Sequence, residues 1–75
     1  MYIVSADFTI DENLNDIFDM EDHITETYSC GKDSGAGFGF RDVSFYIQDE
    51  QDAWDVLLYM RKYNPVSDSI YKEDE

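Results

Sequence analysis

The excess of acidic residues constrains the fold of this chain more than any other feature of its sequence. Eighteen Asp and Glu face five Lys and Arg within 75 residues, which gives a formal net charge of −13 at pH 7. Mutual repulsion on this scale opposes a compact state. A stable fold must therefore turn the carboxylates outward and gather its apolar residues into one core. Aromatic residues make up 16% of the chain, and they bury large areas from few positions.

The length of the chain indicates a single domain. Its one cysteine, Cys30, cannot form an internal disulfide, which is typical of a reducing compartment. No apolar run approaches the ~20 residues of a membrane-spanning helix, and the start of the chain lacks a signal-peptide pattern. We therefore expect a cytoplasmic protein.

The first third of the chain predicts a strand followed by a helix. Residues 2–10 alternate between apolar and polar side chains, which favours a strand with one apolar face. Residues 11–24 carry apolar side chains at helical spacing, with Asp11 as the expected N-cap. Glu21 falls inside the apolar stripe of that helix, which indicates an early end near residues 20–24 or a solvated edge.

The middle of the chain predicts a β-hairpin. Residues 25–30 suit a strand, and the glycine-rich residues 31–37 are expected to turn the chain into a second strand. The apolar residues of that second strand fall into two sets one residue out of step: Phe38 and Phe40, then Val43, Phe45 and Ile47. A bulge near Arg41–Asp42 would return both sets to one face.

Residues 49–63 predict a second helix. Asp49 suits the N-cap, basic residues occupy the last turn, and Asn64–Pro65 stops the helix. The expected core stripe is Ala53, Val56, Leu57 and Met60. The fold class is then α+β, with about three antiparallel strands, two helices on one face and the order β-α-β-β-α. We expect one domain over residues 1–65 and a frayed acidic tail over residues 66–75, in which Ile70 and Tyr71 can add a short edge strand.

The acids concentrate in one segment. Eight acidic residues and no basic residue lie between Asp7 and Glu26. Helical spacing puts four of them opposite the apolar stripe: Glu12, Asp16, Asp19 and Asp22. Neighbours in this row are ~4.5–6 Å apart along a helix axis, similar to the ~3.4 Å charge spacing of one DNA strand. The row is either a mimic of phosphates or simply a solvated helix face.

A second acidic group opens the second helix. N-capping and the helix dipole account for Asp49, Glu50 and Asp52, but not for Asp55. If both helices cover the same face of the sheet, their acidic sides can merge. The candidate partner-binding residues are Glu12, Asp16, Asp19, Asp22 and Glu26, with Asp52 and Asp55 in support.

No motif predicts catalysis or metal binding. The run Gly35–Gly39 has glycines like a phosphate loop, but no helix is expected after it, and an acidic chain repels phosphate. His23 and Cys30 are the only residues of their types, too few for a zinc site. We expect no catalytic residue, no metal and no cofactor, and a protein that is not an enzyme.

Trp54 and Leu58 lie four residues apart on a flank of the second helix, away from its core stripe. They are either peripheral core residues or a surface for self-association, with the tryptophan as anchor. A small regulatory module that forms a homodimer through this flank is the alternative to a charge-driven function.

The small size, the charge and an acidic helix beside a small sheet resemble the acidic inhibitors carried by phages and mobile elements, the anti-CRISPR and anti-restriction DNA mimics. The resemblance implies a non-enzymatic inhibitor that acts in the host cytoplasm. Its implied partner is the basic nucleic-acid-binding surface of a host defence complex. Direct binding to nucleic acid or to a membrane is not expected, because both are negatively charged.

Overall fold

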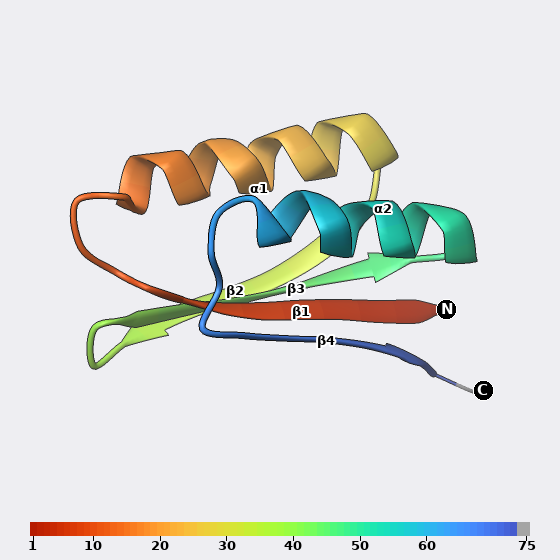
Figure 1. The fold of residues 1–75 in the computed structure, drawn as a ribbon. Helices are drawn as coiled ribbons and strands as arrows, with labels where there is room; N and C mark the ends of the chain where they lie inside the picture. The colour runs from red at the N-terminus through yellow and green to blue at the C-terminus, as the bar shows by residue number, and fades with distance from the viewer. Residues whose placement is uncertain (74–75) are drawn as a thin grey trace.

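The computed structural model describes residues 1–73, which form one two-layer α+β fold (Figure 1). Six elements follow one another along the chain: β1 (Tyr2–Thr9), α1 (Leu14–Tyr28), β2 (Gly31–Gly37), β3 (Phe40–Ile47), α2 (Glu50–Arg61) and β4 (Ser67–Lys72).

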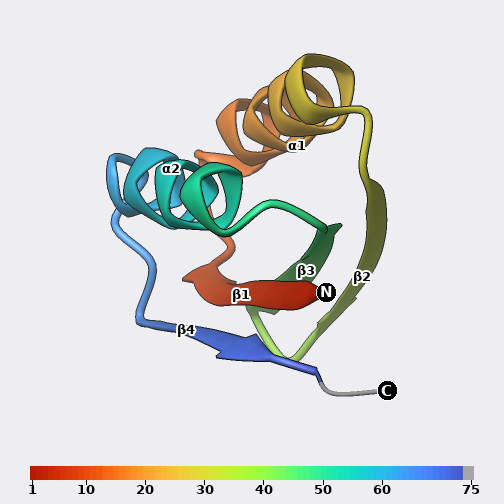
Figure 2. The same cartoon turned by 90° about the vertical axis from the view of Figure 1, so that its right-hand side faces the viewer.

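The four strands make one sheet in the order β2-β3-β1-β4, with every neighbouring pair antiparallel. Both helices cover the same face of this sheet, and the other face carries no helix (Figures 1 and 2). The β-α-β-β-α-β order with this pairing is the split βαβ arrangement. The α+β class and the helical layer agree with the sequence prediction. The prediction of about three strands was one too few.

The core lies between the sheet and the helices. The alternation in β1 is confirmed: Val4, Ala6 and Phe8 are buried beneath the helices. β1 is central because it pairs with β3 on one side and β4 on the other. The remaining core residues are Ile17, Met20, Ile24, Val43, Phe45, Ile47, Ala53, Val56, Leu57 and Met60.

The hairpin differs from the prediction in its turn and its register. β3 pairs with β1 without interruption from Phe40 to Ile47, so the predicted bulge at Arg41–Asp42 is absent. Phe38 and Phe40 are out of step with the buried residues of β3 for a different reason. Phe38 sits in the two-residue turn with Gly39, both at positive φ (55° and 81°), as a type I′ hairpin turn requires. Phe40 faces away from the helices, on the opposite face from Val43.

The segments before this turn were predicted wrongly. Residues 25–28 continue α1 to Tyr28, and Ser29 ends the helix in the left-handed region. Residues 31–37, the expected turn, form the edge strand β2 paired with β3. Glycine-rich sequence has little intrinsic strand preference. Its pairing with β3 determines its conformation here.

The start of α1 also shifts. The helix begins at Leu14, after a turn in which Asp11 and Asn13 exchange side-chain to backbone hydrogen bonds of 3.3 and 3.0 Å. Asp11 is therefore not the N-cap, and Glu12 precedes the helix. The expected early end near residues 20–24 is also wrong, because the helix continues to Tyr28. The alternative, a solvated edge at Glu21, is wrong as well, because that residue is buried.

The second helix agrees with the sequence. Asp49 caps it, accepting a 3.0 Å hydrogen bond from the Asp52 backbone N–H, and all four predicted core residues are buried.

The predicted tail forms β4 up to Lys72, including the expected strand at Ile70 and Tyr71. Asp74 and Glu75 lie outside the described residues. Within residues 1–73, neither helix has the length and apolar character needed to cross a membrane.

Candidate partner-binding surface

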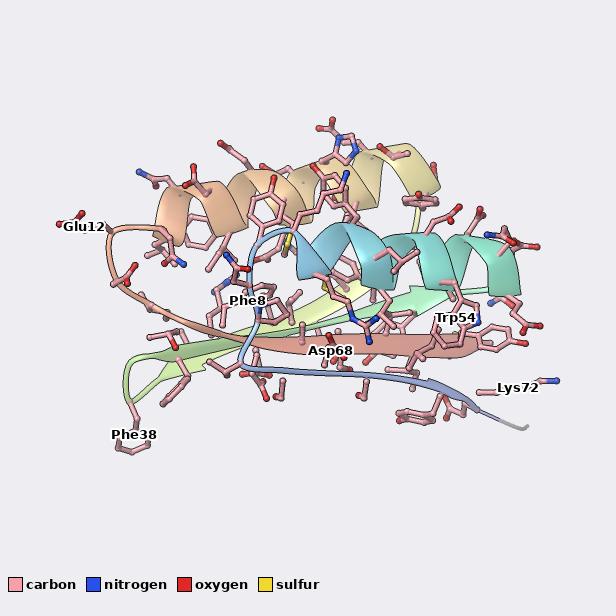
Figure 3. All side chains as sticks on the ribbon, in the orientation of Figure 1. Phe8, Glu12, Phe38, Trp54, Asp68 and Lys72 are labelled. Carbon is pink, nitrogen blue, oxygen red and sulfur yellow. The ribbon has the colours of Figure 1, made fainter. Side chains whose placement is uncertain are left out.

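The outer face of α1 carries exposed carboxylates, and the helix contains no Lys or Arg. Asp16, Asp19, Asp22 and Glu26 are all exposed. Within residues 1–73, none of them takes part in a salt bridge. Glu12 extends the row beyond the end of the helix, where it points away from the fold (Figure 3). We call these five residues the acidic row.

An aromatic seam joins the two helices. The His23 ring on α1 stacks on the Tyr59 ring on α2, with centroids 4.7 Å apart and planes 23° from parallel. Tyr59 in turn contacts Tyr63, and their hydroxyl oxygens are 3.4 Å apart. The seam holds the outer faces of α1 and α2 in one layer.

The carboxylates of each helix act on a tyrosine at the junction of the two helices. The hydrogen bond with Tyr59 and burial raise the pKa of Tyr63 to about 12, with further contributions from the charges of Asp16 and Asp19. At the other end of α1, burial raises the pKa of Tyr28, and the charges of Asp55 and Asp52 raise it further. The α1 acids therefore face the end of α2, and the α2 acids face the end of α1. Both helices cover the same face of the sheet, which is the arrangement that allows their acidic sides to merge (Figure 2).

The basic residues are largely occupied elsewhere. Within residues 1–73, three of the five Lys and Arg residues are in ion pairs: Lys32 and Arg41 with Glu21, and Arg61 with Asp68. Lys62 lies 5.5 Å over the Tyr59 ring. Lys32 and Arg41 are held at the buried Glu21, and Arg61 joins α2 to Asp68 on β4, so within residues 1–73 none of the three forms a salt bridge with the acidic row.

Glu21 was expected at an early helix end or at a solvated edge, but the structure buries it inside α1. Its side chain is 0% exposed, and both carboxylate oxygens are bound. Oε2 accepts a 2.6 Å hydrogen bond from Arg41 Nε. Oε1 accepts 2.8 Å and 3.0 Å bonds from Lys32 Nζ and Arg41 Nη2. The only sequence signal was the acid within an apolar stripe, and its partners are 11 and 20 residues away.

The surroundings of Glu21 decide its ionisation. Burial by itself would raise the pKa of this carboxyl group, but the hydrogen bonds and charges of Arg41 and Lys32 outweigh burial and lower it below the ordinary value of 4.5. Arg41 is further held by the Ser34 hydroxyl at 3.1 Å and by the Phe18 ring, whose centroid lies 4.7 Å from the guanidinium carbon. The cluster ties α1 to β2 and β3, so it fixes the position of the acidic row.

The helix-free face of the sheet is acidic as well, but it is built differently. Asp7 and Asp42 are directly opposite in the β1–β3 register, although like charges at such positions are destabilising. Two carboxylates on this face accept hydrogen bonds from neutral hydroxyl groups: Ser67 donates to Asp7 at 2.8 Å, and Tyr46 donates to Asp33. Asp7 and Asp42 are paired across two strands, and Asp33 lies opposite Ser44 on the next strand pair, so these carboxylates do not follow one element as those of the acidic row do.

Cys30 and the candidate metal ligands are the other residues with potential reactivity that the sequence singled out. Burial raises the pKa of the Cys30 thiol, although a backbone hydrogen bond opposes the change, so little nucleophilic thiolate is present at neutral pH. Within residues 1–73, no three His, Cys, Asp or Glu side chains are placed to hold a metal ion.

Trp54 and Leu58, the residues considered for self-association, are 45% and 54% exposed on α2.

No model of a known protein family matches the chain, and a search of curated proteins finds no match either.

Proposed function

We propose that this protein is a non-enzymatic inhibitor that presents carboxylates in place of nucleic-acid phosphates. Its partner is the basic nucleic-acid-binding surface of a host defence complex of the CRISPR or restriction type. The observation that carries the proposal is the separation of charge. Among the described residues the acidic row is exposed and has no salt bridge, while Lys32, Arg41 and Arg61 are paired with other carboxylates.

The geometry of α1 supports this function. A helix is rigid and repeats its side chains at fixed intervals, so Asp16, Asp19 and Asp22 present charges ~4.5 Å apart along the axis. A channel lined with Lys and Arg at phosphate spacing can pair with such a row. The Glu21 cluster and the aromatic seam hold α1 in place before binding, which reduces the entropy lost on association.

The charge also favours rapid binding. A net charge of −13 attracts a basic surface over distance, and such steering raises association rates well above those of neutral pairs. The attraction is screened by salt, whose Debye length is about 8 Å at physiological ionic strength. Both properties suit a competitor of nucleic acid.

The test is binding to purified CRISPR surveillance and restriction complexes at increasing salt, with double-stranded DNA as competitor. We expect at least one complex to bind, with an association rate that falls steeply as salt rises, and DNA to displace the protein. Affinity that is unchanged in high salt, or binding in the presence of saturating DNA, would contradict the proposal. A neutral protein of similar size serves as the control for nonspecific adsorption.

The second candidate is a homodimeric regulatory module, which the exposure of Trp54 and Leu58 favours. Light scattering across a dilution series separates the two candidates. For the inhibitor we expect the mass of one chain, 8.8 kDa, at every concentration, with Trp54→Ala unchanged. A doubled mass that Trp54→Ala abolishes, together with the loss of the protein's activity, would support the dimeric module instead.

A further inference from the structure

Phe38 is the most exposed large apolar residue of the described chain, and the fold makes no use of its side chain. It stands at the tip of the β2–β3 hairpin, fully exposed to solvent, and points away from the molecule in Figure 3. An exposed phenylalanine ring contributes nothing to the core. Isolated exposed apolar residues are common, so exposure by itself does not indicate a role.

The backbone at Phe38 gives a second reason for attention. Its φ is +55°, in the left-handed region, where a bulky residue is strained and Asn or Gly is preferred. The next residue, Gly39, meets the same requirement without strain at φ +81°. Phenylalanine is therefore unfavourable at this position on two grounds, solvation and backbone strain. Strained residues that persist in a fold concentrate at functional sites.

The tip is also held rigidly. The Ile10 N–H donates a 2.7 Å hydrogen bond to the Gly39 carbonyl oxygen, which ties the hairpin turn to the loop between β1 and α1. A two-residue turn has few alternative conformations. The Phe38 ring is thus held in a defined position before any partner binds, as an interface anchor requires.

The neighbourhood of Phe38 indicates what it contacts. The loop that holds the tip continues directly into Asp11 and Glu12, which with Asn13 and Asp16 line a shallow acidic concavity. Figure 3 shows Phe38 and Glu12 at the same end of the molecule, and Trp54 and Lys72 at the other. One partner surface can reach both the concavity and the ring.

We propose that Phe38 is the apolar anchor of the interface with the basic partner. The occupant is a protein surface with an apolar pocket for the ring beside Lys or Arg side chains that enter the concavity. This inference rests on the proposed function and adds a contact that salt does not screen. It makes the acidic row responsible mainly for the association rate, and Phe38 for the lifetime of the complex.

Phe38→Asn tests the anchor, because Asn tolerates the left-handed conformation. Without the strain and the exposed ring, we expect the thermal unfolding midpoint to rise by about 3–5 °C. Affinity for the complex that binds the wild-type protein should fall about 10- to 100-fold, mainly through faster dissociation. The loss should be the same factor at low and at high salt. Trp54→Ala, an exposed aromatic at the opposite end, is the matched control and should leave affinity unchanged.

The outcomes separate the two proposals. If the wild-type protein binds a complex in a salt-dependent manner and Phe38→Asn binds equally well, the anchor is refuted and the proposed function stands. If no complex binds the wild-type protein, both proposals fall. A Phe38→Asn protein that is no more stable than wild type would overturn the strain argument. A wild-type dimer that Phe38→Asn dissociates would make a second copy of this chain the occupant, which also refutes the proposal.

Discussion

Arg41→Met should destabilise the protein by about 3–5 kcal/mol, the usual cost of removing one partner from a buried ion pair. Small domains have about 5–15 kcal/mol in total, so we expect a large unfolded fraction at 37 °C. The reason is the position of Glu21, whose carboxylate is 0% exposed and would keep only Lys32 as a cationic partner. Chemical denaturation followed by circular dichroism measures the loss.

Arg61→Met is the matched control for this experiment. Arg61 makes a similar two-pronged contact with Asp68, at 2.9 and 3.3 Å, but the arginine side chain is half exposed. Exposed ion pairs contribute little, so this variant should remain close to wild type. Equal losses in the two variants would show that burial of the Glu21 cluster is not important. The double variant Glu21→Leu/Arg41→Met should be more stable than Arg41→Met, because it leaves no buried carboxylate unpaired.

The same cluster has a defined pH dependence. Because the folded protein lowers the Glu21 pKa below 4.5, ionised Glu21 stabilises the fold above that pH. This contribution is lost as the pH falls through the lower value of the folded state. Wild type should therefore exceed Glu21→Gln in unfolding free energy at pH 7, and the difference should shrink below about pH 4.5. The comparison cancels the loss of general repulsion in acid, which both proteins share.

Reversing the charges of Asp16 and Asp19 should abolish tight binding to the basic partner. The double variant Asp16→Lys/Asp19→Lys places two positive charges in the middle of the acidic row, and like charges brought together at an interface cost several kcal/mol. We expect an affinity loss of at least about 100-fold, with a slower association rate and a weaker salt dependence. Surface plasmon resonance at several salt concentrations measures all three quantities.

Asp33→Lys/Asp42→Lys changes the net charge by the same amount on the helix-free face of the sheet, where both residues are exposed. It should slow association slightly and leave the lifetime of the complex unchanged. If both double variants lose affinity equally, overall charge rather than the acidic row drives binding, and the mimicry of ordered phosphates is refuted. Circular dichroism of each variant checks that the fold is retained.

Elements whose signal is local could be predicted from the sequence. The alternation over β1 and the 3.6-residue stripe of α2 identify their buried faces, because burial on one side repeats with the period of the element itself. The Asp49 cap lies next to the backbone group it binds. The exposure of the acidic row also followed, since unpaired carboxylates are rarely buried.

Features that depend on a partner distant in the sequence could not be predicted. Residues 31–37 read as a turn, and only pairing with β3 makes them a strand. Phe38 and Phe40 read as one face of a strand, although a two-residue turn divides them. Glu21 read as a helix end or a solvated edge, because nothing adjacent to it in sequence shows that Lys32 and Arg41 will reach its carboxylate.

Charge and periodicity are properties of neighbouring residues, so the exposed row of carboxylates on the first helix could be recognised from the sequence. Only the tertiary arrangement shows that, among the described residues, this row has no salt bridge, because Lys32 and Arg41 pair with Glu21 and Arg61 pairs with Asp68. For Lys32 and Arg41 the cause is desolvation, since the buried Glu21 carboxylate must be paired by cations. These two cations are then no longer available to neutralise the surface.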